Sequence, residues 1–396
     1  MSNQPTRRDA LAAAGAGLLI VKPETAFGSQ ANSAVPFGII GTGGRGVYVG
    51  GHMARDKNAR LAAICDLYPD RIDQAKTNIP GADKVKATKD LNELLAMQDI
   101  DAVLIATPVY LHPAHFEAAV KAKKHIYCEK PAGADVAGVK RLLKAGLAAD
   151  PTKTIQFGFQ QRFSPEYIKG LNYLKDGTLG EMKLMMSYWV LGGVPLQPFT
   201  PKYTGDEAKI RYWGYFMETS GGPIVEQDCH GIDTLNQFAG DRHPLKALGA
   251  GGLRYKRMYG DWKTDYQNIT FFYPNGLEGA LISIKQTCGF RSVKEQFFGS
   301  KAMLEMARTY LKLHGPIPTS PLKNADDLED RSLIEKVESK REITIDAIES
   351  FFQSIVDKRP YNMTRTSAES TFTALMGRMA VDLKREVTWE EMLKAG

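Results

Sequence analysis

The feature that most constrains this chain is a glycine-rich turn that follows directly after an apolar, strand-like run. Residues 35–40 lead into the sequence GTGGRG at 41–46, which has the spacing G-x-G-x-x-G. In such a turn Gly41 permits the sharp bend, Gly43 lets a pyrophosphate approach the backbone, and Gly46 lets the next helix pack closely. The N–H groups at the start of that helix then face the phosphates. The pattern predicts a dinucleotide-binding site.

An acidic residue stands where such a site needs one. A second strand-like run, 60–65, ends at Asp66, about 20 residues after the glycine turn. A carboxylate at this position accepts hydrogen bonds from the adenosine ribose and repels a 2′-phosphate, so we expect NAD, with NADP as the alternative. Arg71 would favour NADP, but we expect it to be a solvated residue that opens the next helix.

Composition and charge narrow the class of protein. The chain has 396 residues, enough for two domains, and 43% of them are hydrophobic. Its net charge of +6 is spread among acids without a basic stripe, so we expect no nucleic-acid partner. The four cysteines form no C-x-x-C motif, which argues against a disulfide framework or a zinc site. No apolar run is long enough to span a bilayer.

The first 34 residues form a separate segment. Arg7 and Arg8 precede a weakly apolar stretch, 12–21, and small residues follow it. This order is typical of a twin-arginine export signal. We therefore expect export to the periplasm, with an uncleaved arm and a cytoplasmic location as the alternative. The twin-arginine route carries folded proteins, so an exported enzyme would carry its cofactor bound and recycle it in place.

Strands and helices alternate up to about residue 157. Strand-like runs at 102–106, 124–128 and 154–158 alternate with helical patterns at 115–124 and 134–149. This alternation predicts a doubly wound parallel sheet in a domain spanning 35–157. Ligands bind beyond the carboxyl ends of such strands, so we expect Thr107, Pro108 and the segment 129–131 to line the crevice.

The pattern changes from about residue 180. Strand-like runs at 182–190, 246–251, 266–273, 279–286, 294–299 and 302–306 follow one another without regular crossover helices. We expect an α+β domain over 158–396, with an open, largely antiparallel sheet. Residues 200–217 read as a loop over the site. Helices at 345–356 and 367–385 close the chain and are expected to pack back on the first domain.

Several motifs in order resemble the glucose-fructose oxidoreductase/inositol dehydrogenase/rhizopine catabolism (Gfo/Idh/MocA) family. Besides GTGGRG they are IATPVYLH at 105–112, CEKP at 128–131, FQQRFSP at 159–165 and GGPIVEQDCHGID at 221–233. The resemblance implies a Rossmann domain followed by an open-faced sheet that forms the interface of a dimer or tetramer. It also implies NAD(P) as cofactor and a redox reaction at a hydroxyl or carbonyl of a sugar, glycoside or cyclitol.

The resemblance also assigns roles to residues. Lys130 would donate a hydrogen bond to the substrate oxygen beside the nicotinamide, with its pKa lowered by the apolar crevice, and His230 would be the general base. Glu226, one helical turn before His230, would orient or charge that ring, and Asp233 can do the same. The residues expected at the cofactor are Gly41, Thr42, Gly43, Gly44, Arg45, Gly46, Asp66, Thr107, Pro108, His112, Glu129 and Lys130.

A second group of residues is expected at the substrate. Arg162 and Gln161 resemble substrate- or nicotinamide-side residues, and Trp213 with Tyr212 would either stack on a sugar ring or pack in the core. The family commonly has Asp four residues before the base and Gly two before it; here these positions hold Glu226 and Asp228. We expect Asp228 at the substrate. These acids and the base do not share one helical face, so no metal is expected.

Two classes of function remain open. The first is an NAD(P)-dependent oxidoreductase acting on CH–OH groups. The second is an NAD-dependent glycoside hydrolase, which oxidises a sugar carbon transiently, eliminates the leaving group and regenerates the cofactor. A non-catalytic NAD-binding module is a third reading, and the pair Lys130 and His230 argues against it.

Overall fold

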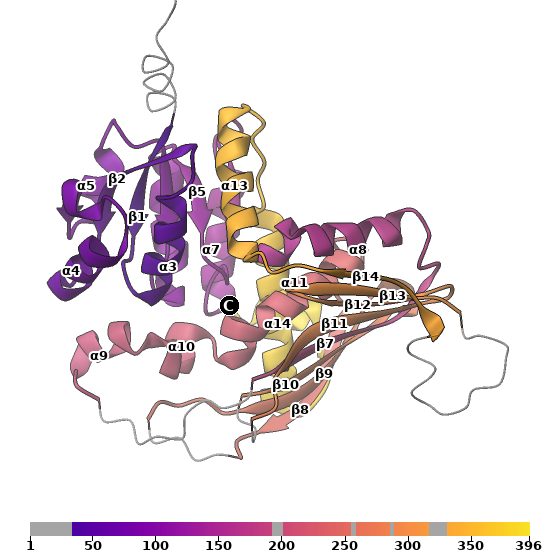
Figure 1. The fold of residues 1–396 in the computed structure, drawn as a ribbon. Helices are drawn as coiled ribbons and strands as arrows, with labels where there is room; N and C mark the ends of the chain where they lie inside the picture. The colour runs from indigo at the N-terminus through magenta and orange to yellow at the C-terminus, as the bar shows by residue number, and fades with distance from the viewer. Residues whose placement is uncertain (1–33, 192–200, 255–258, 286–288, 317–330) are drawn as a thin grey trace, which may run out of the picture. The chain divides into compact units, whose positions relative to one another are not determined.

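The computed structural model describes residues 34–191, 201–254, 259–285, 289–316 and 331–396. The expected export signal and Cys288 lie outside these residues, and the other three cysteines are free and buried. From Val35 onward the chain builds two β-sheets (Figure 1).

The first sheet is the expected doubly wound one. Its six strands are all parallel and lie in the order β3-β2-β1-β4-β5-β6. They are β1 (Val35–Ile40), β2 (Ala59–Cys65), β3 (Lys86–Thr88), β4 (Ala102–Ile105), β5 (His125–Cys128) and β6 (Ile155–Phe157). The order reverses between β1 and β4, and a crevice opens at such a switch point beyond the carboxyl ends of the strands. The predicted fold class is confirmed.

Helices cover both faces of this sheet, because the strands are apolar on both sides. They are α3 (Gly44–Met53), α4 (Pro69–Asn78), α5 (Leu91–Ala96), α6 (His112–Lys121) and α7 (Val136–Leu147). Helix α6 begins three residues before the predicted start, since Pro113 occupies its first turn, where a missing N–H costs nothing.

A helix from the end of the chain completes one face of the first sheet. Helix α13 (Ile343–Val356) inserts Phe351 and Phe352 among the residues of β1 and β5. The ring of Phe352 lies 5.7 Å from that of Phe37, and the ring of Phe351 lies 5.7 Å from that of Tyr127. Figure 1 shows α13 beside the strands of this sheet. The core of the first sheet is therefore completed by residues more than 200 positions away in sequence.

The second sheet has nine strands in the order β14-β13-β12-β11-β7-β10-β9-β8-β15. They are β7 (Met182–Val190), β8 (Lys246–Gly252), β9 (Tyr266–Phe272), β10 (Glu278–Ile284), β11 (Ser292–Gly299), β12 (Met303–Ala307), β13 (Tyr310–His314), β14 (Leu333–Glu338) and β15 (Val387–Thr388). Only β7 and β10 pair in parallel; the other pairs are antiparallel. The expectation of a largely antiparallel sheet is confirmed.

One face of the second sheet is packed and the other is more exposed. Helices α8 (Pro165–Lys175), α11 (Cys229–Phe238) and α14 (Thr364–Leu383) pack against its strands. Burial alternates along β7, β9 and β10, as in a sheet with one covered face.

The expectation of a plain loop at 200–217 was wrong for the described residues from 201 onward. They contain α9 (Gly205–Arg211), the 3₁₀ turn η4 (Trp213–Tyr215) and the start of α10 (Met217–Ser220). These elements are too short to show a helical period in the sequence. Helix α9 is instead marked by acids in its first turn and Lys209 and Arg211 in its last, which suits the helix dipole.

Candidate active site

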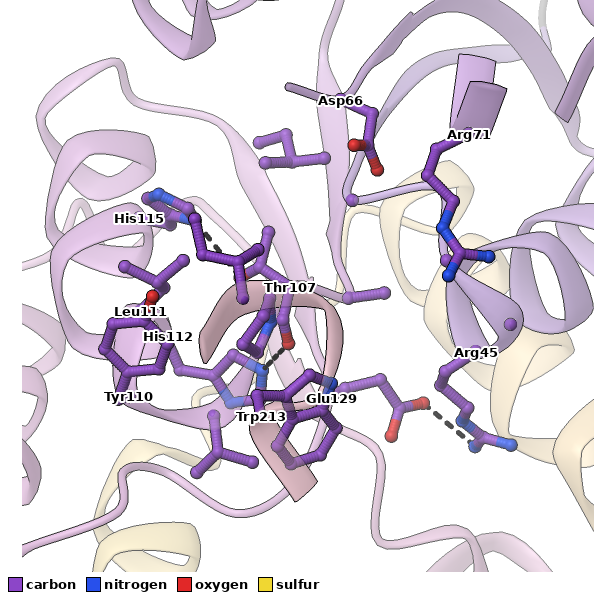
Figure 2. Close-up of a pocket in the computed structure, with 18 of the residues that line it drawn as sticks. Arg45, Asp66, Arg71, Thr107, Tyr110, Leu111, His112, His115, Glu129 and Trp213 are labelled. Carbon is purple, nitrogen blue, oxygen red and sulfur yellow. Dashed lines mark hydrogen bonds and ion pairs between the residues drawn. The ribbon is translucent and has the colours of Figure 1, made fainter. Parts of the chain in front are cut away.

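A cavity of about 640 Å³ opens where β1, β2, β4 and β5 end. Figure 2 shows part of its lining, which comes from the first sheet, from the segment 201–216 and from the start of α11. Thirteen of the predicted residues line this cavity. They are Gly41, Gly43, Gly44, Arg45, Asp66, Thr107, Pro108, His112, Glu129, Lys130, Trp213, Glu226 and His230. The fold therefore brings the expected cofactor motif and the expected catalytic pair into one space.

The glycine turn fits a dinucleotide. Gly41 has φ +89°, and a Cβ on Gly46 would stand 1.9 Å from the carbonyl oxygen of Gly41, so neither position accepts a side chain. A Cβ on Gly43 or Gly44 would meet nothing within 4 Å, which leaves open space beside the backbone. Helix α3 begins at Gly44, so its free N–H groups face that space, as pyrophosphate binding requires.

Asp66 lies at the end of β2 and organises the turn around it. Its carboxylate accepts a hydrogen bond from the backbone N–H of Thr42 at 2.8 Å and from that of Tyr68 at 3.1 Å. Arg71 lies in the first turn of α4, as expected, and it also lines the cavity near Asp66 (Figure 2). Its guanidinium donates to Gln74 at 2.9 Å.

His112 braces the two loops that hold the middle of the cavity. The ring is buried, with its nitrogens 2.7 Å from the carbonyl oxygen of Pro131 and 2.9 Å from that of Thr107 (Figure 2). The peptide between Lys130 and Pro131 is cis. Burial lowers the pKa of His112 although both carbonyls oppose that shift. His112 therefore fixes the backbone on either side of Lys130.

Arg45 and Glu129 form an ion pair on the wall of the cavity. The guanidinium of Arg45 lies 2.9 Å from the carboxylate of Glu129, whose side chain is 4% exposed (Figure 2). Both residues belong to the predicted cofactor set. Their pairing ties the glycine turn to the loop after β5, which is the loop that carries Lys130.

Lys130 is held by Glu226. Its ammonium donates to the main-chain oxygen of Glu226 at 2.5 Å and to the carboxylate at 3.1 Å. Burial lowers the pKa of Lys130, but the neighbouring acidic groups, first among them Glu226, together outweigh burial, so the pKa is raised. The expectation of a lowered pKa was therefore wrong, because the crevice supplies a carboxylate as well as apolar walls. Lys130 remains a cation and a hydrogen-bond donor at neutral pH.

His230 lies against aromatic rings rather than against an acid. Its ring is parallel to the indole of Trp189, with an interplanar angle of 6° and centroids 5.6 Å apart, and the ring of Phe159 meets it edge-on. Its Nδ1 is buried without a hydrogen-bond partner among the described residues. Burial, followed by the charges of Lys130, Arg308 and Arg45, lowers its pKa well below the ordinary value. The ring is therefore neutral at pH 7 and able to accept a proton.

The expected contact between Glu226 and His230 was wrong. Residues Ile224–Asp228 form a π-helix, η5, immediately before α11. The prediction assumed α-helical spacing, which would put the two side chains on one face; the wider π turn breaks that relation, and the carboxylate binds Lys130 instead. Such turns are frequent at functional sites.

Asp228 was expected at the substrate, and the structure places it elsewhere. It is fully buried, forms an ion pair with Lys285 and accepts a hydrogen bond from Gln267 at 2.7 Å. Gln267 lies in β9 of the second sheet, and Lys285 directly follows β10. Asp228 therefore fixes η5 to that sheet and does not line the cavity.

Arg162 and Gln161 are also outside the cavity lining. Arg162 makes two hydrogen bonds to Asp233, at 2.7 and 2.8 Å, and a further one to Asp241 at 2.8 Å. Asp233 accepts another from Ser370, so it is occupied away from His230 and does not orient that ring. Gln161 is 1% exposed in the 3₁₀ turn Gln160–Phe163. Arg162 therefore helps to hold α11 in place. The expectation of direct substrate contact was wrong for both Arg162 and Gln161, because neither lines the cavity.

The segment 201–216 closes the adenosine end of the cavity. Arg211 at the end of α9 makes a bidentate ion pair with Asp70 at the start of α4, at 2.7 and 2.8 Å. Its guanidinium also lies 3.9 Å from the ring centroid of Tyr68, the residue two positions after Asp66. Trp213 lines the cavity, which agrees with its expected place, whereas Tyr212 packs against Tyr203 and Tyr259. We call residues 201–216 the strap.

Sequence reasoning missed Gln160, Arg211, Trp189 and Arg308. Gln160, Arg211 and Arg308 line the cavity, and Trp189 stacks on the base. Gln160 lies within FQQRFSP, but that motif does not identify it as a cavity residue. The other three stand in no motif. Strand alternation alone marks Trp189 as an inward position of β7.

Comparison with known proteins identifies the family of this chain. The Gfo/Idh/MocA family model, described as an oxidoreductase family with an NAD-binding Rossmann fold, matches residues 35–158. Inositol 2-dehydrogenase of Pseudarthrobacter chlorophenolicus is 34% identical over 251 residues, which are 62% of this chain and 72% of that enzyme. Inositol 2-dehydrogenase of Rhizobium meliloti is 32% identical over 236 residues, 60% of this chain; the match spans 64% of that enzyme, slightly under two thirds of its length.

A solved structure repeats the whole fold. Levoglucosan dehydrogenase in complex with NADH and levoglucosan aligns with a TM-score of 0.73 at 16% identity, covering 90% of this chain and 99% of that one. The chain belongs to the Gfo/Idh/MocA oxidoreductase family, and its first sheet is the NAD-binding Rossmann fold of that family.

The described residues lack two further features. They contain no cluster of three or more His, Cys, Asp or Glu side chains able to hold a metal ion. Within the same residues, no helix combines the length and the apolar character that a membrane crossing requires.

Proposed function

We propose that this protein uses NAD to oxidise a secondary hydroxyl group of a cyclitol or sugar, or to reduce the corresponding ketone. The observation that carries the proposal is the meeting of the glycine turn, Asp66, Lys130 and His230 in one cavity. The related inositol dehydrogenases and the fold shared with a levoglucosan enzyme support a polyhydroxylated ring as the substrate.

The glycine turn and the start of α3 would hold the pyrophosphate, and Asp66 would accept hydrogen bonds from the adenosine ribose. When bound, NAD supplies the hydride acceptor. The neutral ring of His230 takes the hydroxyl proton as the C–H bond breaks. Lys130 donates a hydrogen bond to the same oxygen and stabilises the negative charge that develops on it. Glu226 keeps Lys130 charged and aimed, which is a positioning role.

The strap supports slow exchange of the cofactor. Arg211 joins α9 to Tyr68 and Asp70, which follow Asp66 closely in the chain. A segment of the same chain therefore spans the adenosine end of the cavity. A bound cofactor recycled in place suits a protein exported in the folded state. We therefore propose that Arg7 and Arg8 direct periplasmic export, and that the more exposed face of the second sheet joins two or four copies.

The proposal is tested by purifying the protein, identifying any bound nucleotide, and offering cyclitols, sugars and aryl glycosides with and without added NAD. A rise in NADH with a cyclitol or sugar supports it. Cleavage of an aryl glycoside without net NADH, with exchange of the neighbouring sugar C–H in deuterated water, would replace it by the oxidation–elimination hydrolase.

A further inference from the structure

The reaction end of the cavity contains a third cation that the proposed mechanism does not use. Arg308 stands in the turn between β12 and β13 of the second sheet and lines the cavity together with Lys130, Glu226 and His230. Its charge is among the causes that lower the pKa of His230. Arg308 therefore lines the cavity near the proposed base.

The guanidinium of Arg308 is positioned by an aromatic ring. It lies 5.6 Å from the centroid of the Trp189 indole, which is the same indole that stacks on His230. Arginine commonly lies over a tryptophan face in this way, and its donors stay free for a ligand at the edge of the guanidinium plane. One indole thus contacts both the proposed base and a hydrogen-bonding cation.

Three other cations of the cavity have carboxylate partners. Lys130 is paired with Glu226, Arg45 with Glu129, and Arg211 with Asp70. The Nε of Arg308 is buried and has no hydrogen-bond partner among the described residues. A buried donor without a partner is costly unless a ligand satisfies it.

Two carboxylates feel the charge of Arg308, and neither forms an ion pair with it among the described residues. Glu295 accepts a hydrogen bond from the hydroxyl of Tyr167 at 2.7 Å. Glu342 caps α13 by accepting from the N–H of Thr344 at 3.1 Å and from its hydroxyl at 2.8 Å. Neither Glu295 nor Glu342 accepts a hydrogen bond from the guanidinium of Arg308 among the described residues.

We propose that Arg308 is a substrate-binding residue that holds a carboxylate, so that the preferred substrate is a sugar acid rather than a neutral sugar or cyclitol. The planar guanidinium matches a carboxylate with two parallel hydrogen bonds. With the acid anchored at Arg308, a hydroxyl of the same molecule meets His230 and Lys130. This inference rests on the proposed oxidoreductase function and narrows its substrate class.

The test compares matched pairs, glucose with gluconate and glucuronate, and myo-inositol with the same acids, using wild type, Arg308→Gln and Arg308→Lys. For the wild type we expect kcat/KM for an acid to exceed that for its neutral counterpart by about 100-fold or more, which corresponds to at least about 2.8 kcal/mol. Arg308→Gln should raise KM for the acid by about 100-fold and leave the neutral sugars within about 3-fold. Arg308→Lys should recover part of the loss. Arg359→Gln, at an exposed arginine, is the matched control.

Equal or better use of the neutral sugars by wild type overturns the inference and leaves the proposed function standing. The same holds if Arg308→Gln impairs acids and neutral sugars equally. If no compound reduces NAD, the proposed function fails, and binding still tests Arg308 through quenching of tryptophan fluorescence by gluconate. Saturable quenching in wild type that Arg308→Gln abolishes supports the anion site; no quenching, or quenching unchanged by the substitution, refutes it. Melting temperatures of all variants establish that they are folded.

Discussion

Replacing Lys130 by Met keeps the length and the apolar stem of the side chain while removing its charge. The ammonium of Lys130 makes two hydrogen bonds to Glu226 and is the proposed donor to the substrate oxygen. Removing one such donor from a preorganised site costs about 2.7–4 kcal/mol of transition-state stabilisation, a loss of about 10²- to 10³-fold in rate. We expect the rate of hydride transfer to fall by this factor while NAD still binds at the glycine turn and Asp66.

The same substitution has two side effects that the structure allows us to separate. The side chains of Lys130 and Glu226 are 12% and 21% exposed, so the stranded carboxylate keeps some solvent. Breaking a fully buried pair costs about 3–5 kcal/mol, and we expect about 1–2 kcal/mol of stability here. Because the charge of Lys130 lowers the pKa of His230, its loss should also move the acidic limb of the residual pH–rate profile to higher pH.

The assay is single-turnover stopped-flow measurement of NADH formation with C–H and C–D substrate. Glu226→Gln and the double variant Lys130→Met/Glu226→Gln are the controls, since they remove the stranded carboxylate. Lys130→Met should show a slow step with a full isotope effect. A near-normal rate of hydride transfer in this variant would refute the electrostatic role of Lys130.

Three further predictions test the cofactor end and the acid response. Asp66→Ala should weaken NAD binding by about 10- to 100-fold and NADP binding much less. The variant loses the hydrogen bond from Thr42 to Asp66 with either cofactor, but only NAD also loses a ribose acceptor; equal losses of affinity in titrations would contradict this. Arg211→Ala should raise the rate of NADH dissociation by about 5- to 30-fold, because the ion pair and the contact with Tyr68 together contribute about 1–2 kcal/mol; an unchanged rate would mean that the strap does not gate release. The free energy of unfolding should fall on acidification from pH 6.5 to pH 5 by up to about 1.4 kcal/mol per pH unit for each buried histidine.

The sign of the acid response follows from four histidines. Burial lowers the pKa of His112 and His230, and lowers that of His115 and His125 to about 4. Below pH 6.5 these histidines bind more protons in the unfolded chain than in the folded one. Glu295, whose pKa burial raises to about 7, acts in the opposite direction but offsets only part of this difference, so acid destabilises the fold. Denaturant titrations at pH 6.5, 5.75 and 5 check this, and a stability that rises toward pH 5 would contradict it.

Much of the first sheet could be predicted because its signals are local. The glycine turn, the acid that ends β2 and the strand ends at Thr107 and Glu129 all lie within a few residues of the element that positions them. The topological rule that parallel strands present their carboxyl ends on one edge then gathers them into the cavity. The export segment and the oligomer stay predictions.

The errors cluster where distant or irregular structure decides a side chain's direction. Glu226 was assigned to His230 by α-helical spacing, and the π turn gave it to Lys130 instead. Asp228 and Arg162 were read as functional because of their motif, yet Lys285 and Asp233, which no local pattern links to them, engage them. Arg308 was missed because a turn in an antiparallel sheet carries no sequence signal for what it faces.

The proposed function requires direct hydride transfer from substrate to NAD in the cavity of Lys130 and His230. The measurement is mass spectrometry of the nucleotide after one turnover with a sugar or sugar acid deuterated at the reacting carbon, in wild type and His230→Ala. We expect one deuterium on the reduced nicotinamide in wild type and none in His230→Ala, although that variant still binds NAD. Unlabelled NADH in wild type, or full labelling in His230→Ala, would contradict the account.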